Sequence, residues 1–470
     1  MRLAPLLAGV AATLVTSIAI GVPAPWRDEQ ATATAASRDW GQLLDLVTGS
    51  TDAVHGTFYG LMKLWVGAVG IDPFWLRLPS AIAVGFAAAG VVVLGSMLDR
   101  TRTGLIAAAI LVLLPRVFWA GGEARSYALQ IAAAVWLTVL FVQAVRKGRW
   151  WRWLLFGVAT AAANWLFLYL ALVGLAQLIT LALVPAWRNR LLPALAAIAG
   201  AAVAATPILL FGFAQRGQIS WVPVPDLGVV GAVAQSQWFM GSTVFSIVAW
   251  VLVIGGVVAI CLTPSSRRER LALLLPWLIL PTVVLIVVSL LVSPIYLDRY
   301  LGMSAPAIAL LAALAITRLP LIAAVVALAV VVAAAIPVAI EQRTPTAKGD
   351  WGEVAALAGE NARDGEAVYF STDPFDDEPR GLVTFYPDAF AGLDDIAFAE
   401  SAAEAGTLRD RVTPLSVALD KLDPGQTLIT ILSDDSDAAA VDRVTLERRG
   451  FDETVIGDTG LTSVSRWTAP

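Results

Sequence analysis

The sequence predicts an α-helical polytopic membrane protein with a small soluble α/β domain at its carboxyl end. Its composition is 58% hydrophobic and only 15% charged, with a mean hydropathy of +0.75. Apolar stretches recur from the first residues to about position 340 and then stop. Because a helix needs about 20 residues to cross a hydrocarbon core about 30 Å thick, much of this chain is expected to lie in lipid.

About eleven stretches are expected to span the membrane. Their bounds are 3–22, 79–98, 105–120, 129–145, 154–165, 168–184, 191–211, 244–262, 271–292, 301–316 and 321–340. The fifth stretch is short, and a tight turn near Asn164 is expected to separate it from the sixth.

The distribution of Lys and Arg predicts the orientation. Alternate short connections are strongly basic, at 99–102, 146–152, 187–190, 267–270 and Arg318. Such connections stay in the cytoplasm during insertion, so we expect a multi-pass protein of the cell membrane with a cytoplasmic amino terminus. The long connections at 23–78 and 212–243 and everything after 340 are then extracytoplasmic, which makes the outer face the working face.

We therefore predict a transmembrane domain over residues 1–340 with structured outer loops, and a soluble domain over 341–470. The second part holds 26 of the 37 acidic residues against 11 Lys and Arg. Its patterns alternate between strand and helix, as in small α/β domains. The expected elements are a helix over 351–362 capped by Asp350, strands over 367–371 and 427–433, a helix over 434–450 and a strand over 461–467.

In the first outer loop, segments 39–49 and 55–70 have helical spacing of apolar residues. They are too interrupted to span the membrane comfortably. Their Trp and Tyr residues are typical of helices that lie in the membrane interface.

Two adjacent carboxylates, Asp28 and Glu29, follow the first apolar stretch. Carboxylates at a membrane boundary are costly to desolvate unless they are paired, hydrated or functional. Pairing with Arg27 is a simple structural alternative.

Charged and aromatic residues gather at two further outer boundaries. Arg116, Glu123, Arg125 and Tyr127 end the third stretch, and the turn before the tenth reads SPIYLDRYL, which contains Tyr296, Asp298, Arg299 and Tyr300. Arginine can grip phosphate oxygens with its planar guanidinium and stays charged near lipid. The alternative is that these arginines extend to phospholipid headgroups.

The only histidine, His55, lies in the first outer loop. Its near-neutral pKa suits an acid, base or hydrogen-bonding role, although it could equally be a neighbour of a helix cap. The sequence shows no His, Cys and carboxylate cluster with the spacing of a zinc site, and the acidic run 376–378 is predicted to be a solvated turn. No cofactor is predicted, and a requirement for a divalent metal stays open.

Five segments, taken together and in order, resemble motifs of the GT-C superfamily of polyprenyl-phosphate-sugar glycosyltransferases. They are WRDE, the histidine segment before FYGLMKLW, FWLRLPSA, GGEARSYAL and SPIYLDRYL. Within that superfamily the set is similar to bacterial relatives of dolichyl-phosphate-mannose protein mannosyltransferases and of the lipid A aminoarabinose transferase. The resemblance covers roughly residues 1–340 and implies a GT-C-like fold.

The resemblance also implies roles for residues. Asp28 matches the catalytic carboxylate, with Glu29 supporting substrate or loop geometry. Arg125 and Arg299, with Arg116 third, are implied to bind the donor phosphate. The residues implied to orient substrates are His55, Glu123, Tyr127, Tyr296 and Tyr300. Family members often carry His-Pro-Pro where this chain has His55-Gly56-Thr57, which leaves the acceptor side open.

The expected function is transfer of a sugar from a polyprenyl-phosphate donor to a glycan, lipid or protein acceptor outside the cell. The high Ala, Val, Gly and Trp content and scarcity of Lys suggest a high-GC genome, and by association mannose as the sugar. Membrane lipid is an expected partner and nucleic acid is not. A transporter or lipid flippase, or a non-catalytic envelope assembly protein, is the alternative; the nearly charge-free span interiors disfavour transport.

Overall fold

A computed structural model describes residues 3–49, 51–263, 267–372, 379–434 and 436–469. The chain divides into two compact units. The first comprises Met1–Ile18, Asp52–Phe58 and Arg77–Glu341. The second comprises Ala19–Thr51, Tyr59–Leu76 and Gln342–Pro470, so each unit is assembled from segments far apart in the sequence.

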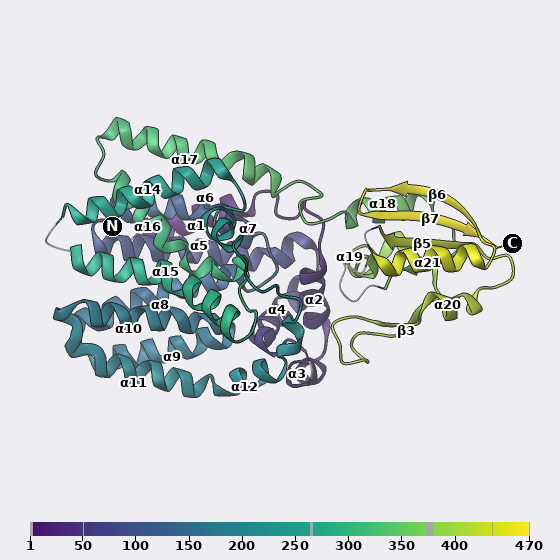
Figure 1. The fold of residues 1–470 in the computed structure, drawn as a ribbon, viewed down its shortest axis with the longest axis horizontal. Coiled ribbons are helices and arrows are strands. Elements are labelled where there is room, and N and C mark those ends of the chain that lie inside the picture. Colours follow the sequence, from purple (N-terminus) through teal and green to yellow (C-terminus); the bar gives the residue numbers. More distant parts are fainter. Residues whose placement is uncertain (1–2, 50, 264–266, 373–378, 435, 470) are drawn as a thin grey trace. The chain divides into compact units, whose positions relative to one another are not determined.

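The first unit is a bundle of helices (Figure 1). Its main helices are α1 (Leu3–Ser17), α5 (Pro73–Leu98), α6 (Thr101–Leu113), α7 (Pro115–Gly121), α8 (Tyr127–Lys147), α9 (Trp150–Leu166), α10 (Ala171–Leu183), α11 (Leu191–Ala204), α12 (Thr206–Ala214), α14 (Thr243–Cys261), α15 (Arg267–Leu291), α16 (Ala305–Ile316) and α17 (Leu321–Glu341). Among the described residues, six helices are long and apolar enough to cross a membrane, or up to eight if each bent pair is one span.

Helices occupy every stretch that the sequence predicts to span, but the structure does not establish eleven as their number. Two stretches expected to be single spans are bent. α6 and α7 meet at 71°, and the segment Pro185–Ala204 meets α12 at 49°. Pro115 explains the first bend, since proline disfavours helical backbone at the preceding residue, and Leu114 is extended with φ −63° and ψ 120°.

α16 lies at the centre of the bundle. The helical segment Asp298–Ile316 contains α16, and 89% of its most apolar 18-residue stretch is buried inside the protein. The corresponding share for α17 is 22%. α14 packs closely on α16 because Gly256 has no side chain: a Cβ there would lie 2.0 Å from the Leu311 carbonyl oxygen. Small residues allow this close approach between helices in membrane proteins.

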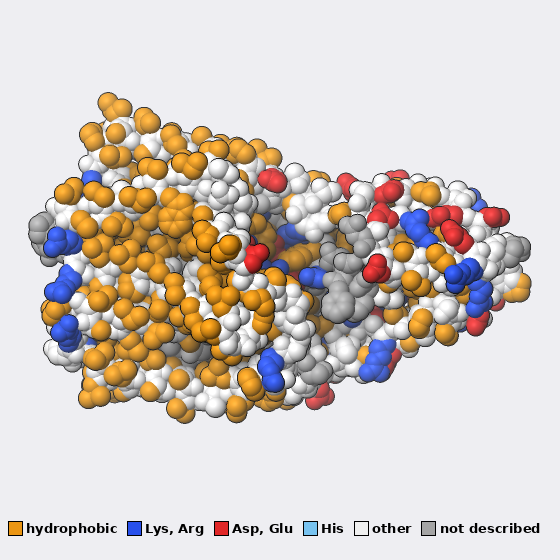
Figure 2. Space-filling model, viewed as in Figure 1, with side chains coloured by type: hydrophobic (Ala, Val, Ile, Leu, Met, Phe, Trp, Pro, Cys, Tyr) orange, Lys and Arg blue, Asp and Glu red, His pale blue; other side chains and the backbone are white. Residues whose placement is uncertain are grey.

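The basic connections gather at one end of the bundle, where Figure 2 shows Lys and Arg along the edge of a surface of hydrophobic side chains. Arg270 donates to the Asp99 carboxylate at 3.1 Å and to the Leu98 carbonyl at 2.9 Å. Arg146 lies 3.8 Å from Glu269. The few acidic residues of these connections are therefore paired, and the cytoplasmic placement of this end stays a prediction from the charge pattern.

The second unit begins with helices from the amino-terminal part of the chain. α3 (Trp40–Thr48) and α4 (Gly56–Val69) confirm the helices predicted over 39–49 and 55–70, whereas α2 (Arg27–Ser37) was not predicted. α3 starts with a capping box in which the Asp39 carboxylate accepts from the Gln42 amide at 2.8 Å. Buried Arg38, between α2 and α3, donates to the Ala402 and Thr407 carbonyls, which ties these helices to the carboxyl-terminal part of the chain.

The carboxyl-terminal part contains a five-stranded sheet with the order β2-β1-β5-β7-β6. The strands β1 (Ala367–Phe370), β2 (Asp394–Asp395) and β5 (Leu428–Ser433) are parallel, and β7 (Thr462–Thr468) and β6 (Asp452–Asp458) complete the sheet in antiparallel pairs. β3 (Phe398–Glu400) and β4 (Arg411–Val412) form a separate antiparallel pair. The short helices are α13 (Val229–Gly231) in the first unit and α19 (Leu382–Phe385) and α20 (Leu415–Ala418) here.

Helices cover both faces of the sheet. Val368 and Phe370 of β1 pack in one cluster with α18 (Trp351–Asn361). Ala367 and Tyr369 pack on the opposite face with α21 (Asp437–Arg448), because successive strand residues point to opposite faces. These layers confirm the predicted α/β architecture.

Several local predictions for this domain can be compared with the structure. The strands near 367–371, 427–433 and 461–467 and both helices are present, but the sequence missed β2, β3, β4 and β6. Asp350 precedes α18 as expected, yet its predicted capping role is wrong, because its carboxylate accepts from the Thr459 hydroxyl at 2.5 Å instead of from the helix. The turn predicted at 376–378 lies outside the described residues.

A buried carboxylate gives this domain an expected pH dependence. The Asp442 carboxylate accepts from the Tyr369 hydroxyl at 2.9 Å, and burial raises the pKa of Asp442 to about 6. The unfolded value is about 3.9, so the folded state holds more protons between these values. This group therefore destabilises the fold above pH 6, and its penalty disappears as the pH falls towards 4.

We expect Asp442→Asn to raise the melting temperature relative to the unmodified protein at pH 8 and to give a smaller gain at pH 5. Comparing the two proteins at each pH removes the contribution of other titrating groups. Thermal unfolding of the full chain in detergent, followed by tryptophan fluorescence, measures both differences. An equal difference at the two pH values would contradict the expectation.

Candidate functional site

Arg116 joins three segments of the first unit near the bend between α6 and α7. Its Nη2 donates to the Asp298 carboxylate at 2.6 Å and to the Ser236 carbonyl at 2.9 Å, and its Nε donates to the Gln237 carbonyl at 3.0 Å. The Arg116 side chain is only 5% exposed. Because these bonds occupy the guanidinium, the geometry favours a positioning role for Arg116 over direct phosphate binding.

The loop that leads to Asp298 is held at both ends. The Ser289 hydroxyl accepts from the Ile295 and Tyr296 amides at 2.9 and 2.8 Å. The buried Tyr296 hydroxyl donates to the Gln237 side chain at 3.1 Å, and burial together with the nearby Asp298 raises the pKa of the Tyr296 phenol. Tyr296 is thus a neutral hydrogen-bond donor that supports the 3₁₀ helix Asp298–Ser304, called η6, which follows.

Arg125 and Glu123 lie in the turn between α7 and α8. Both are buried, with Glu123 fully covered and Arg125 7% exposed. The Ser80 hydroxyl of α5 contacts the backbone of this turn, donating to the Glu123 carbonyl at 2.5 Å and lying 3.4 Å from the Arg125 carbonyl. α5 therefore fixes the backbone that carries Arg125.

An aromatic cluster connects this turn with η6. The Tyr127 ring lies 5.2 Å from the Trp119 ring and 6.4 Å from the Tyr300 ring. Tyr300 also contacts Phe167 at 6.0 Å and Tyr169 at 5.7 Å. Tyr127 and Tyr300, which the sequence placed at two separate boundaries, thus belong to one cluster.

Residues of the outer connection 212–243 contact Arg299 and the segment that carries His55. The Arg299 guanidinium lies 5.7 Å from the centre of the Trp221 ring, within the range of a cation–π interaction. Gln215 and Gln218 accept from the Ala53 and Asp52 amides at 2.8 and 3.0 Å, which fixes the short helix Ala53–His55. The segment 215–221 therefore links the His55 and Arg299 regions of the first unit.

The acidic motif lies in the second unit. Asp28 and Glu29 occupy the first turn of α2, where the helix dipole stabilises negative charge. Glu29 is fully buried and accepts from the Lys348 ammonium at 2.9 Å, whereas Asp28 is half-buried. The pair with Lys348 gives Glu29 a structural role in the second unit.

Seven predicted residues therefore gather in the first unit around the ends of α7, α8 and η6, with His55 connected through the segment 215–221. Asp28 and Glu29 belong to the second unit. The sequence missed the side chains that support these groups, namely Ser80, Trp221, Gln237, Ser289 and Lys348. Each is an ordinary residue type without a local motif, so only its contacts identify it.

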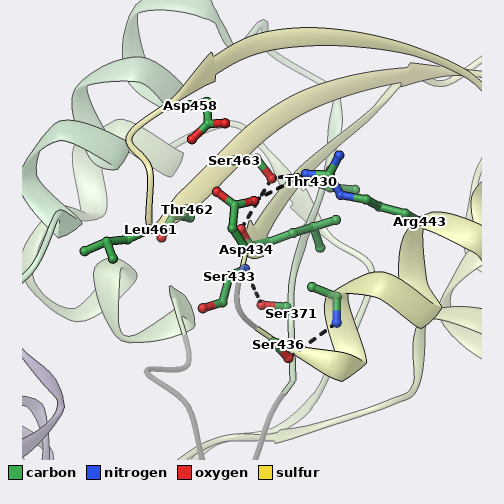
Figure 3. Close-up of polar contacts among 12 residues, drawn as sticks. Ser371, Thr430, Ser433, Asp434, Ser436, Arg443, Asp458, Leu461, Thr462 and Ser463 are labelled. Atoms are coloured by element: carbon green, nitrogen blue, oxygen red, sulfur yellow. Dashed lines mark hydrogen bonds and ion pairs between the residues drawn. The ribbon is translucent and has the colours of Figure 1, made fainter.

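The carboxyl edge of the parallel strands is a second position where open α/β sheets often bind ligands. Figure 3 shows its polar residues engaged with one another. Ser371 accepts from the Ser433 amide at 3.1 Å, Ser436 caps α21, and Arg443 lies between Asp434 and Ser463. Burial and nearby Asp458 raise the pKa of Asp434. This network stabilises the domain.

A groove of about 780 Å³ between α10 and α15 is apolar along its length, with Arg267 and Arg268 at one end. These arginines begin the 25-residue α15, about 37 Å from the end that leads to Tyr296. Among the described residues, the groove lining reaches Val283 on α15 and includes none of Arg116, Arg125 and Arg299. Among the described residues, no three His, Cys, Asp or Glu side chains form a group that could hold a metal ion.

The fold is similar to that of GT-C superfamily structures over nearly the whole chain. The chain is similar to ArnT from Cupriavidus metallidurans bound to undecaprenyl phosphate, with a TM-score of 0.60 and 13% identity over 99% of this chain and 98% of that one. It is also similar to the oligosaccharyltransferase AglB from Archaeoglobus fulgidus in complex with an inhibitory peptide and a dolichol-phosphate, with a TM-score of 0.54 and 12% identity over 98% of this chain and 74% of that one. No family model and no curated protein sequence matches the chain.

The buried pair in the second unit gives a test of the structural role of Glu29. Lys348→Met breaks the buried ion pair between Lys348 and Glu29, and the loss of one member of a buried pair typically costs about 3–5 kcal/mol. We expect this variant to melt at a lower temperature and the double variant Lys348→Met with Glu29→Gln to recover most of the loss. Thermal unfolding in detergent measures both effects, and a single variant as stable as the unmodified protein would contradict the role.

Proposed function

We propose that the protein is a membrane glycosyltransferase that moves a sugar from a polyprenyl-phosphate donor to an acceptor outside the cell membrane. Mannose is the sugar we expect, and a glycan, glycolipid or protein the acceptor. The observation that best supports the proposal concerns Arg125 and Arg299 of the GT-C-like bundle: Arg125 is buried in a turn that Ser80 contacts, and Arg299 is half-buried beside the Trp221 ring. The similarity to a GT-C structure that holds undecaprenyl phosphate agrees with a lipid-linked donor.

In the proposed reaction the Asp28 carboxylate and the two arginines have distinct roles. Asp28 acts as general base and takes the proton of an acceptor hydroxyl while that oxygen attacks the anomeric carbon of the donor. The bond from this carbon to the phosphate oxygen breaks, and the polyprenyl phosphate leaves with one additional negative charge. Arg125 and Arg299 stabilise that charge as it develops.

The neighbouring residues prepare these groups for reaction. Arg116 holds η6 through Asp298, and Tyr296 supports the same segment through Gln237. Glu123, Tyr127, Tyr300 and His55 are proposed to orient the donor or the acceptor. Asp28 is only half-buried, which leaves its carboxylate partly accessible, unlike that of Glu29.

The direct test incubates the purified protein in detergent or nanodiscs with a panel of labelled polyprenyl-phosphate sugars and a cell-envelope extract as acceptor. We expect one donor to be consumed, with release of polyprenyl phosphate and labelling of the acceptor. The mannose-bearing donor is the expected member. Consumption of a different sugar would correct the sugar alone, and consumption of none would refute the proposed transfer.

Asp28→Asn should reduce transfer by about 10²–10⁴-fold, the contribution that a general base typically makes. The protein should still fold and enter the membrane. Asp45→Asn, an exposed carboxylate on α3, is the matched control and should keep full activity. If Asp28→Asn retains activity close to that of the control, Asp28 is not the base.

Arg299→Gln should weaken transfer by about 10–100-fold, because a charge-assisted contact with the leaving phosphate is lost. Arg299→Lys should recover little, since the planar fork is not replaced by a point charge. Arg216→Gln, an exposed arginine of the same outer connection, serves as control. Steady-state kinetics with the preferred donor measures the effect, and equal rates for the Arg299 and Arg216 variants would remove Arg299 from the phosphate site.

A further inference from the structure

Two polar side chains at the start of α8 are buried without hydrogen-bond partners. Gln130 and Ser126 are both fully covered. Among the described residues, neither the Gln130 amide atoms Oε1 and Nε2 nor the Ser126 hydroxyl has a hydrogen-bond partner. Buried polar groups are nearly always satisfied in folded proteins, so three such atoms on adjacent turns of one helix require a physical explanation.

Their position places them beside the proposed phosphate-binding residues. Ser126 and Gln130 are four residues apart and therefore lie on the same face of α8. Ser126 directly follows Arg125, and its other neighbour, Tyr127, contacts Tyr300 of η6. The two unsatisfied side chains thus directly follow the turn that carries Arg125.

Gln130 faces η6 at a residue without a side chain. A Cβ on Gly302 would lie 3.9 Å from Gln130 Nε2. In a 3₁₀ helix, residues three apart are eclipsed, so Gly302 lies on the same face of η6 as Arg299. The Gln130 amide is therefore directed to the face of η6 that carries the proposed phosphate ligand.

The chemistry of the unsatisfied atoms restricts what they can bind. The amide offers one acceptor, Oε1, and two donor hydrogens on Nε2, and the serine hydroxyl can donate or accept. A phosphodiester supplies only acceptors and would leave Oε1 unsatisfied. A pair of sugar hydroxyl groups supplies donors and acceptors together and matches all three atoms.

We propose that Gln130, with Ser126, binds hydroxyl groups of the sugar carried by the polyprenyl-phosphate donor and selects that sugar. The assignment rests on the proposed glycosyl transfer and adds the residues that read the sugar. Arg125 and Arg299 hold the phosphate, and the α8 face holds the ring next to it. The site selects against a sugar that lacks the matched hydroxyl, because that sugar would leave the buried Gln130 amide without a hydrogen bond.

A second glutamine provides a matched control. Gln177 of α10 is also buried, with Oε1 unpartnered among the described residues, and its Nε2 donates to the Thr138 hydroxyl at 3.3 Å. Thr138 lies eight residues beyond Gln130 on α8, which is about 12 Å along the helix axis. Gln177→Met therefore removes a buried amide from the bundle interior without touching the proposed sugar contact.

The experiment compares the unmodified protein with Gln130→Met, Ser126→Ala and Gln177→Met. Each is assayed with the polyprenyl-phosphate sugar that the unmodified protein transfers best and with monodeoxy analogues of that sugar. We expect the unmodified protein and Gln177→Met to prefer the parent sugar over one analogue by at least about 100-fold in kcat/KM. Gln130→Met should transfer the parent sugar poorly and reduce this preference to below about 5-fold, and Ser126→Ala should reduce it partially.

Thermal unfolding of the same variants without donor separates the binding role from a structural one. Because removing an unsatisfied buried amide does not remove a native hydrogen bond, Gln130→Met should melt no lower than the unmodified protein. Preserved discrimination in Gln130→Met, or no discrimination by the unmodified protein at any hydroxyl, would overturn this assignment while leaving the transfer reaction intact. Failure of the unmodified protein to transfer any sugar would instead refute the proposed function, and this assignment with it.

Discussion

The arrangement of the first unit depends on the ion pair and hydrogen bonds that the Arg116 guanidinium makes. The guanidinium joins α7, the segment 236–237 and η6 through an ion pair and two backbone carbonyls, although Asp298 is 182 residues away. Irregular backbone at membrane depth is tolerated only where protein groups satisfy it. Arginine suits this position because its rigid fork presents several donors and keeps its charge when buried. Arg116 therefore connects the helix that follows the bend at Pro115 with both η6 and the segment 236–237.

Adjacent residues in α2 show how one local motif divides into two environments. Successive helix residues are rotated by about 100°, so Asp28 and Glu29 cannot face the same surroundings. Glu29 meets Lys348 inside the second unit, while Asp28 keeps partial access to solvent. Neighbouring carboxylates in one helix turn can therefore have different environments, a feature that catalytic sites use to give two carboxylates different roles.

The sequence was sufficient for the membrane helices and for the layers of the carboxyl-terminal domain, because hydrophobic length and period act locally. Pro115 and Pro207 were visible in the apolar stretches, but whether proline bends a span or begins a new one depends on its partners. The supporting contacts could not be predicted for a related reason. Lys348 follows Glu29 by 319 residues, and Gln130 stands in an apolar helix where only the absence of a partner distinguishes it. For Asp350 the local pattern predicted a contact that is not made. Its position before α18 is that of a helix cap, but its carboxylate accepts from the Thr459 hydroxyl instead.

The composition of the second unit has a consequence for the order of folding. Its helices α2 and α3 are made first by the ribosome, whereas Lys348, Ala402 and Thr407, which hold them, are made only after the last helix of the bundle. During synthesis Glu29 and Arg38 are therefore made before the groups that they contact in the folded protein, namely Lys348 for Glu29 and the Ala402 and Thr407 carbonyls for Arg38. The acidic motif can reach its final geometry only when the carboxyl-terminal segment has been completed, so a chain that stops early would contain the whole bundle but an unassembled α2.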